Sequence, residues 1–299
     1  MSKQTPYYPS MNPYTEPAHP CPLCNQAKNI SKQDTSLSIY YCKQCAHVFS
    51  VVSKNEPYNT TYFSETHKNW YVHPDTHLFK KLLAEYNSYK SLRTSNPSPS
   101  LLDLGCGKGQ LLHYFLENNI DSELYGIDFA TNKHQEIQFL TGDLCSVSFN
   151  KTFTTIVSTA VIEHVNNPHE FLNKIDTELA HDGVLIIMTI NRNSLLYRIA
   201  RWLKALHIRS AYDRLHHHHH IQHWSNKSLA NFLKLKGFQI KKQWNYNAPL
   251  IALDFPSNNP ILVFLYKGCM SIIYVLSNIF SNQWLQVVVC TKKTKQTIA

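Results

Sequence analysis

Four of the eight cysteines in this 299-residue chain stand in two closely spaced pairs. Seventeen residues separate the two pairs, which are Cys21 with Cys24 and Cys42 with Cys45. Four thiolates at this spacing are typical of a closed, tetrahedral zinc site, and His47 is then not needed as a ligand. We expect a structural Zn²⁺ in a small ribbon. Disulfides are the alternative, but no secretory signal sequence is recognisable to support them.

Three of the eight glycines alternate along one short segment, at Gly105, Gly107 and Gly109. They follow the apolar run 101–104, which contains Asp103, and precede a helical pattern over 110–118. Glycine is required where the backbone has a positive φ or where a ligand must touch the main chain. The segment therefore predicts a strand, a ligand-binding turn and a helix. Neither common phosphate loop fits, because Gln110 replaces a glycine of the dinucleotide pattern and no Gly-Lys-Ser/Thr end is present.

The elements that follow resemble those of class I S-adenosylmethionine (SAM) methyltransferases. The segment Asp-x-Gly-x-Gly-x-Gly, beginning at Asp103, resembles the first motif of that family. Asp128 ends a second apolar strand 25 residues later, and Asp143 ends a third. Residues 153–165 resemble the fourth strand with its Glu-His-Val exit, and further strands are predicted at 184–189, 239–244 and 285–290. Strands that alternate with helices predict an α/β fold, a Rossmann-like, mostly parallel sheet of seven strands with its ligand at the carboxyl ends.

The resemblance implies a SAM site at the ends of the first three strands. In the family, the glycine loop passes beneath the methionine part, the second acid accepts from the ribose hydroxyls, and the third strand ends at the adenine. Carried over residue by residue, the implied cofactor-binding residues are Asp103, Gly105, Cys106, Gly107, Gly109, Asp128, Phe129, Asp143 and Leu144. Two departures fall beside the expected cofactor. Thr154 replaces an acid at the start of the fourth strand, and the segment 129–142 is short, so its helix is expected to be one turn or absent.

Differences in composition along the sequence divide the chain into four parts. With 43% apolar residues, the chain can bury a substantial core. We expect a disordered tail at 1–17, the zinc ribbon at 18–50, a helical lid or linker at 51–95, and the methyltransferase domain at 96–299. The helix predicted over 78–92 either folds over the cofactor pocket or packs on the sheet edge. A ribbon ahead of this core resembles a broad group of bacterial methyltransferases, many of them found near cell-surface polysaccharide genes.

His164 follows the predicted fourth strand, whose end faces the transferred methyl group in the family. Methyl transfer from a sulfonium is an in-line displacement, so most of the catalysis is alignment, but an oxygen nucleophile must also lose a proton. We predict that His164 is the catalytic base. Alternatively, Glu163 and His164 only hold the loop in place. His223 and the histidine run 216–220 are weaker candidates for the base.

The segment 214–238 aligns with the substrate-side loop of the family and contains five consecutive histidines at 216–220. Such a run binds divalent metals adventitiously. We expect it to form a solvated loop at the mouth of the pocket rather than a physiological metal site. Ser225 should cap a helix over 226–236.

Residues 260–280 are almost entirely apolar and numerous enough to cross a bilayer as a helix. This segment joins the sixth and seventh strands, which pair in one sheet, so a single crossing would separate the two strands. We favour a helix that lies in the membrane interface or walls a lipid-accepting groove. A dimer or core helix is the second interpretation, and a true span is the third.

The formal net charge of +9 favours an anionic partner, although no dense run of Lys and Arg is present. We predict a cytoplasmic SAM-dependent methyltransferase, peripheral at the inner membrane, that methylates an oxygen of a lipid-linked or nucleotide-linked sugar or of a quinone-like lipid. RNA methylation is the alternative, because a ribbon beginning Cys-Pro-Leu-Cys also resembles a bacterial ribosomal RNA guanine methyltransferase, whose zinc ligands include a histidine. A non-catalytic zinc-ribbon binding protein is the third hypothesis. Whether the chain forms an oligomer stays open.

Overall fold

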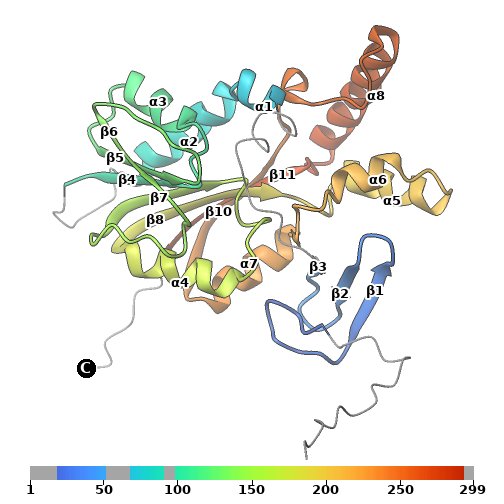
Figure 1. The fold of residues 1–299 in the computed structure, drawn as a ribbon, viewed down its shortest axis with the longest axis horizontal. Helices are drawn as coiled ribbons and strands as arrows, with labels where there is room; N and C mark the ends of the chain where they lie inside the picture. The colour runs from blue at the N-terminus through green and yellow to red at the C-terminus, as the bar shows by residue number, and fades with distance from the viewer. Residues whose placement is uncertain (1–18, 52–67, 91–97, 293–299) are drawn as a thin grey trace, which may run out of the picture.

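The computed structural model describes residues 19–51, 68–90 and 98–292. The tail expected at 1–17 and most of the segment between the ribbon and the first helix lie outside these ranges. The described residues form one seven-stranded sheet and one four-stranded sheet. The larger sheet carries helices on both faces, and the smaller sheet lies beside one of its ends (Figure 1).

The seven-stranded sheet has the order β10-β11-β8-β7-β4-β5-β6. Its strands are β4 (Ser100–Leu104), β5 (Glu123–Asp128), β6 (Ile137–Thr141), β7 (Phe153–Thr159), β8 (Leu179–Ile190), β10 (Phe238–Tyr246) and β11 (Leu285–Lys292). Strands β4 to β8 run parallel, and β11 pairs antiparallel with both β8 and β10. Because β4 has β5 on one side and β7 on the other, the strand order reverses at β4, where open α/β sheets bind ligands.

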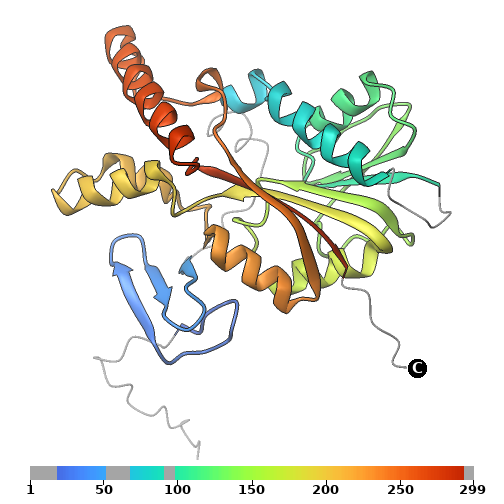
Figure 2. The same cartoon turned by 180° about the vertical axis from the view of Figure 1, so that it is seen from behind.

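Helices α2 and α3 cover one face of this sheet, and α4 and α7 cover the other (Figures 1 and 2). The helices are α1 (Lys68–Val72), α2 (Thr76–Lys90), α3 (Gln110–Glu117), α4 (Pro168–Glu178), α5 (Leu195–Ala205), α6 (Ser210–Leu215), α7 (Asn226–Leu235), the short η2 (Leu250–Ala252) and α8 (Pro260–Ile279). The predicted cap of α7 is confirmed. Ser225 Oγ accepts from the Ser228 amide at 3.1 Å, and Ser228 Oγ accepts from the Ser225 amide at 2.9 Å.

Strand β8 begins before the predicted bound of 184, and its register against β7 shifts: Phe153 faces Leu179, and Thr155 faces Val184. The early part of the strand therefore contains a bulge. Strand β7 ends at Thr159, because Ala160 takes a positive φ of 55° that ends the extended run, and the predicted Glu-His-Val exit follows it. Between β5 and β6 the described chain forms no helix, as its short length predicted.

The four-stranded sheet joins the cysteine ribbon to a distant part of the chain. Its order is β1 (Ile30–Asp34), β2 (Ile39–Cys42), β3 (Val48–Ser50) and β9 (Gln222–His223). His47 is buried beside this junction, where its Nε2 donates to Gln222 Oε1 at 2.9 Å and its ring lies 4.7 Å from that of Trp224. Burial lowers the pKa of His47 to about 4, so the ring stays neutral at pH 7. Its role is to pack the ribbon against the core.

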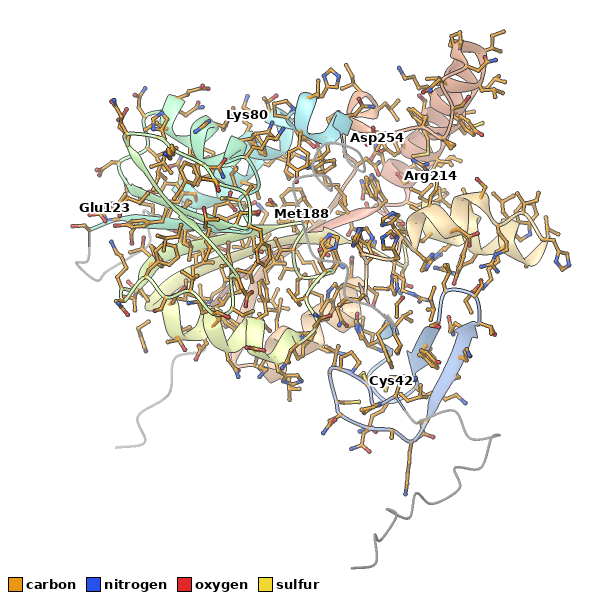
Figure 3. The ribbon with its side chains drawn as sticks, in the orientation of Figure 1. Cys42, Lys80, Glu123, Met188, Arg214 and Asp254 are labelled. Carbon is orange, nitrogen blue, oxygen red and sulfur yellow. The ribbon has the colours of Figure 1, made fainter. Side chains whose placement is uncertain are left out.

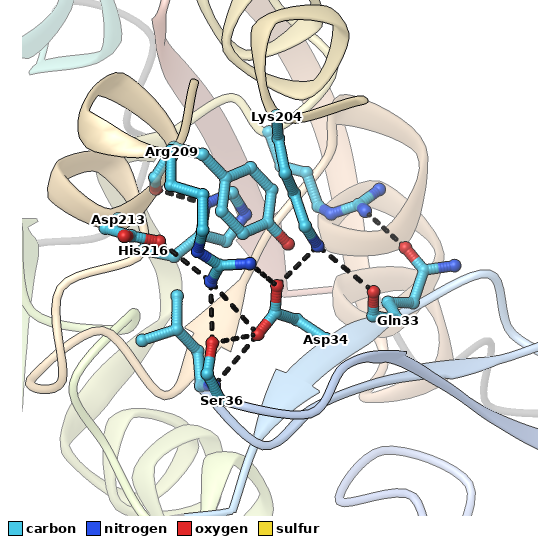
Figure 4. Close-up of polar contacts among 10 residues, drawn as sticks. Gln33, Asp34, Ser36, Lys204, Arg209, Asp213 and His216 are labelled. Carbon is cyan, nitrogen blue, oxygen red and sulfur yellow. Dashed lines mark hydrogen bonds and ion pairs between the residues drawn. The ribbon is translucent and has the colours of Figure 1, made fainter. Parts of the chain in front are cut away.

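A second contact ties the ribbon to helices α5 and α6 (Figure 4). The buried Asp34 carboxylate lies 2.5 Å from Lys204 Nζ and 3.0 Å from Arg209 Nη1. Burial raises the pKa of Asp34, but hydrogen bonds from Arg209 and Lys204 outweigh it and hold the pKa well below its usual value. The ribbon is therefore anchored on two sides, by a strand pairing and by a buried carboxylate.

Helix α8 projects from the same end of the molecule as α5 and α6 (Figures 1 and 2). Ser277 is its only buried residue, although the helix is long and apolar enough to cross a membrane. The interpretation of 260–280 as a core helix is therefore wrong, because nearly all of its side chains face away from the rest of the chain. Its neighbours in sequence, β10 and β11, pair as expected.

Candidate active site

A cavity of about 810 Å³ opens at the carboxyl ends of β4, β5 and β7, a size typical of small-molecule sites. The glycine segment and Asp128 line one side, and the exit of β7 lines another. Residues of α1, α6 and α8 close the remaining sides. Beneath α8, the Arg214 guanidinium donates to the carbonyl oxygen of Asp254, and both residues line the cavity (Figure 3).

The turn after β4 can be built only with glycine. Gly105, Gly107 and Gly109 have φ values of 85°, 53° and 73°. A Cβ on Gly105 would lie 2.3 Å from Val161 Cγ2, and one on Gly109 would lie 2.7 Å from Phe139 Cζ. The first contact presses the turn against the exit of β7, so these two parts of the cavity wall hold each other in place. Gly109 shapes the start of α3 but does not itself line the cavity.

Asp128 is oriented by two backbone amides. Its Oδ2 accepts from Gly107 N at 2.8 Å, and its Oδ1 accepts from Ala130 N at 3.0 Å. Each carboxylate oxygen retains a further acceptor position, because an ionised carboxylate can accept about four hydrogen bonds. A fixed carboxylate in the cavity wall is suited to bind a pair of hydroxyl groups, as predicted for this residue.

Asp103 is fully buried, and its Oδ1 has no hydrogen-bond partner among the described residues. Burial and then the neighbouring charge of Asp128 raise the pKa of Asp103 to about 8. A buried carboxyl of this kind is stabilised in its ionised form by a cationic group in the same space. Since Asp103 lines the cavity, it fits the amino group of an amino-acid moiety such as that of SAM.

The other predicted cofactor residues are brought to the same cavity, whose lining includes Cys106, Phe129, Asp143 and Leu144. The expected disturbance from Thr154 is not found there. Thr154 exchanges hydrogen bonds with Ser100 at the amino-terminal ends of β7 and β4, away from the cavity at their carboxyl ends. The first departure from the family pattern is therefore remote from the site.

Two residues that contact the glycine turn were not predicted. Asn132 Nδ2 donates to the carbonyl oxygen of Gly107 at 2.6 Å, and the carbonyl of Tyr71 accepts from Gln110 Nε2 at 2.7 Å. The Lys108 ammonium lies 5.4 Å from the centre of the Tyr71 ring. Helix α1 thus covers the glycine turn, whereas α2 packs beside α3. The aromatic pair at 70–71 was a signal for α1, but nothing in the local sequence marked Asn132.

His164 lies in the cavity wall directly after the buried Glu163. Its Nδ1 lies 2.9 Å from the carbonyl oxygen of His219. Because a carbonyl can only accept, Nδ1 carries a proton, and in the neutral form of the ring the lone pair lies on Nε2. Glu163 Oε2 accepts from Thr189 Oγ1 at 2.6 Å, and burial raises the pKa of Glu163 to about 7.

The histidine run does lie at the cavity, because His217 and His220 line it. It is less solvated than predicted. His216 is buried, its Nδ1 donates to the carbonyl of Tyr212 at 2.9 Å, and its ring stacks on that of Tyr212. The backbone amides of Ile221 and Gln222 both donate to the carbonyl of Glu163 at 2.9 Å. The run is therefore fastened to the exit of β7.

The four predicted ligand cysteines form one cluster whose sulfur atoms all lie within 4.8 Å of one another. Cys21 and Cys45 sulfurs are 3.4 Å apart, and those of Cys24 and Cys42 are 3.6 Å apart. No disulfide joins these four cysteines, whose sulfur atoms lie farther apart than the roughly 2.05 Å of an S–S bond. A tetrahedral zinc with bonds of about 2.3 Å would separate its sulfur ligands by about 3.8 Å. The cluster fits such an ion.

Sequence comparison places the chain among known proteins. The methyltransferase-domain family matches residues 75–243, more than half of the chain. The chain belongs to this family. The predicted class I fold and the predicted enzyme class of this methyltransferase-domain protein are thereby confirmed.

Two curated relatives of this methyltransferase-domain protein are ubiquinone biosynthesis O-methyltransferases. That of Rickettsia bellii is 26% identical over 133 aligned residues, and the match covers 40% of this chain and 51% of the relative. That of Rickettsia canadensis is 28% identical over 130 aligned residues, and the match covers 40% of this chain and 52% of the relative. The chain thus spans about half the length of the curated relatives it matches.

Among solved structures, this methyltransferase-domain protein is similar to Burkholderia thailandensis 1,6-didemethyltoxoflavin-N1-methyltransferase, solved with 1,6-didemethyltoxoflavin and S-adenosylhomocysteine bound. The TM-score is 0.50 at 12% identity, over 83% of this chain and 96% of the other. At this identity the likeness concerns the fold alone.

Proposed function

We propose that this protein is a SAM-dependent methyltransferase that methylates an oxygen of a lipid-borne acceptor at a membrane surface. The acceptor class is a lipid-linked sugar or a quinone-like lipid, and a nucleotide-linked sugar is the water-soluble alternative acceptor. One observation carries the proposal: a single cavity joins the glycine turn and its two carboxylates to His164 and to the middle of an exposed apolar helix.

The cofactor half of the proposal rests on Asp103 and Asp128. Asp128 binds the ribose hydroxyls, Asp103 binds the amino group, and the end of β6 with Asp143 and Leu144 receives the adenine. The fixed Asp128 carboxylate and the unpartnered Asp103 Oδ1 support these roles. Calorimetry with S-adenosylhomocysteine tests them directly. Asp128→Asn should weaken binding at least tenfold, whereas Asp121→Asn, at an exposed aspartate outside the cavity, should not change it.

His164 activates the acceptor oxygen in this scheme. Its Nε2 carries the lone pair in the cavity wall, where it can receive the hydroxyl proton directly or hold a cation that acidifies the hydroxyl. The methyl carbon then passes from the sulfonium to the oxygen. The C–S bond breaks as the C–O bond forms, and the neutral thioether leaves.

The membrane half of the proposal rests on α8. Tyr266 and Met270 of this helix line the cavity, while Phe264, on the same helix, is 75% exposed. Helix α5, which contacts α8, adds the exposed Trp202 and a basic flank including Arg198. An apolar helix beside basic residues is suited to lie in the interface of an anionic bilayer. A lipid-borne acceptor could then enter the cavity without leaving the membrane.

Two experiments test this function. Label from methyl-tritiated SAM should enter the organic extract of membranes from the same cells, and label in total RNA instead would favour the RNA alternative. Phe264→Glu should reduce sedimentation with anionic vesicles several-fold. Leu235→Glu is the matched control, because Leu235 is 70% exposed on α7. Equal sedimentation of both variants with the unmodified protein would remove the membrane from the proposal.

We also infer that the four-cysteine cluster holds a structural Zn²⁺. The sulfur geometry and the absence of a disulfide among these four residues support the assignment. Elemental analysis should find zinc in the purified protein. Cys24→Ser should lose that zinc and loosen the ribbon, while Cys269→Ser, at an exposed cysteine on α8, should keep it.

A further inference from the structure

We propose that Glu163, His164 and His220 bind a divalent transition-metal cation inside the cavity. One ligand atom from each residue can be chosen so that all three lie within 4.8 Å of one another. Two imidazole nitrogens and one carboxylate oxygen suit Zn²⁺, Mn²⁺, Co²⁺ or Fe²⁺. This site is separate from the four-cysteine cluster, and the binding itself does not depend on the proposed function. Only the role given to the cation rests on it.

The orientation of His164 is the one that a metal ligand needs. Its Nδ1 donates to the carbonyl of His219 at 2.9 Å, which leaves Nε2 as the electron-pair donor. Metal-binding histidines regularly donate their other ring N–H to a carbonyl or a carboxylate, which fixes the tautomer and the angle of the ring. The rings of His164 and His220 meet edge to face with their centres 4.8 Å apart.

Glu163 supplies a buried carboxylate that no lysine or arginine of the described residues pairs with. The side chain is 2% exposed, and one oxygen accepts from Thr189 at 2.6 Å. Among the ion pairs of the described residues, none joins Glu163 to a lysine or an arginine. Burying a carboxylate is costly unless a cation or several hydrogen bonds compensate it. A metal cation at this place supplies the compensation.

The backbone preorganises the third ligand. The amides of Ile221 and Gln222 both donate to the carbonyl of Glu163, so the residue after His220 is tied to the residue before His164. The amide of His220 also donates to the carbonyl of His217 at 2.8 Å. These bonds hold two segments, 56 positions apart in sequence at His164 and His220, in one arrangement.

The three ligands line the same cavity as Gly105 and Asp128, so the cation lies on the acceptor side of the cofactor site. Three protein ligands leave coordination positions open, which is typical of catalytic rather than structural metal sites. An acceptor hydroxyl that binds there loses its proton to solvent, and the resulting alkoxide or phenolate attacks the methyl carbon of the sulfonium. His164 then acts through the cation.

Cobalt binding tests the site without any acceptor. The protein with zinc-loaded ribbon is titrated with Co²⁺ by calorimetry and visible absorption, and zinc is quantified before and after. The unmodified protein should bind a Co²⁺ with nitrogen and oxygen ligands while retaining its ribbon zinc. Glu163→Gln and His220→Asn should each weaken this binding at least about 100-fold. Losing a residue that only hydrogen-bonds to a metal ligand typically weakens metal binding about 10–100-fold, and these two residues are ligands themselves.

His218→Asn is the matched control. His218 is exposed in the same run and belongs to a second group, with His217 and His219, that could hold an ion adventitiously. Loss of Co²⁺ in His218→Asn, but not in Glu163→Gln, would overturn the proposal, as would the absence of Co²⁺ binding in the unmodified protein. S-adenosylhomocysteine binding reports whether each variant is folded. Co²⁺ bound as expected, with no methyl transfer to membranes or RNA, would retain the metal site and reject the proposed function.

Discussion

Substituting Gly105 by alanine tests whether the glycine turn and the exit of β7 are held together by direct contact. The new Cβ would lie 2.3 Å from Val161 Cγ2, at a φ of 85°. The left-handed backbone costs a non-glycine residue roughly 1–2 kcal/mol, and overpacking a well-filled site costs about 1–3 kcal/mol more. Gly105→Ala should therefore lower the free energy of unfolding by about 2–5 kcal/mol.

Gly237 offers a control that isolates the packing contribution. Its φ is 86°, and a Cβ there would meet nothing within 4 Å. Gly237→Ala should therefore show only the backbone cost, roughly 1–2 kcal/mol. The gain from reduced freedom of the unfolded chain is the same for both substitutions and cancels in the comparison.

Denaturant unfolding of the two variants gives the comparison, with the slope checked for constancy. Val161→Ala removes Cγ2, the atom that the new Cβ of Gly105→Ala would contact, and leaves the Cβ of residue 161 at 3.4 Å from that new Cβ. The double variant should therefore be more stable than the sum of the two single effects predicts, by about 1–2 kcal/mol. Binding of S-adenosylhomocysteine should weaken at least tenfold in Gly105→Ala and not in Gly237→Ala. Equal destabilisation by the two glycine substitutions would refute the direct contact.

Three further substitutions test the cap of α7, the carboxylate that anchors the ribbon, and the buried His216. Ser225→Ala removes the acceptor for the Ser228 amide and should lower the unfolding free energy by about 1 kcal/mol, measured by denaturant unfolding. Asp34→Asn should cost about 3 kcal/mol at pH 7, because it leaves two cations without their shared carboxylate; in the unmodified protein this stabilisation is lost only as the pH falls below the ordinary aspartate pKa of about 4. Burial lowers the pKa of His216 to about 4, whereas the pKa of a histidine in the unfolded chain is about 6.5. The unfolded chain therefore binds more protons below about pH 6.5, and the free energy of unfolding decreases as the pH falls. The loss between pH 7 and pH 5 is about 2 kcal/mol for this residue, and His216→Gln should show a correspondingly shallower pH dependence of unfolding.

The parts of the molecule predicted from sequence are those governed by local patterns. The glycine turn, the helix after it and the capping serine of α7 each follow from a few neighbouring residues, and Ser225 caps the helix as expected. The cysteine cluster is equally local, because each pair forms its own turn. Asp128 could be placed because the carboxyl ends of adjacent parallel strands meet at one edge of a sheet.

The parts that were missed depend on long-range packing. His164 and His220 contact each other because the backbone amides of 221–222 donate to the carbonyl of Glu163. Periodicity in the sequence does not predict such a contact. The burial of His47 depends on a strand that arrives 175 positions later at Gln222. The core-helix interpretation of 260–280 was wrong for a related reason, since an apolar run has the same pattern whether a core or a membrane covers it.

The pairing of β3 with β9 has a consequence for synthesis of the chain. The ribbon leaves the ribosome long before residues 222–223, which complete its sheet. The 175 positions from His47 to Gln222 take about 9–35 s to translate at about 5–20 residues per second. For that time the edge of β3 has no partner strand, and an unpaired edge is a template for pairing with other nascent chains. The ribbon is thus the first part of the described chain able to begin folding and among the last to be finished, and overexpression at high ribosome density should favour its aggregation.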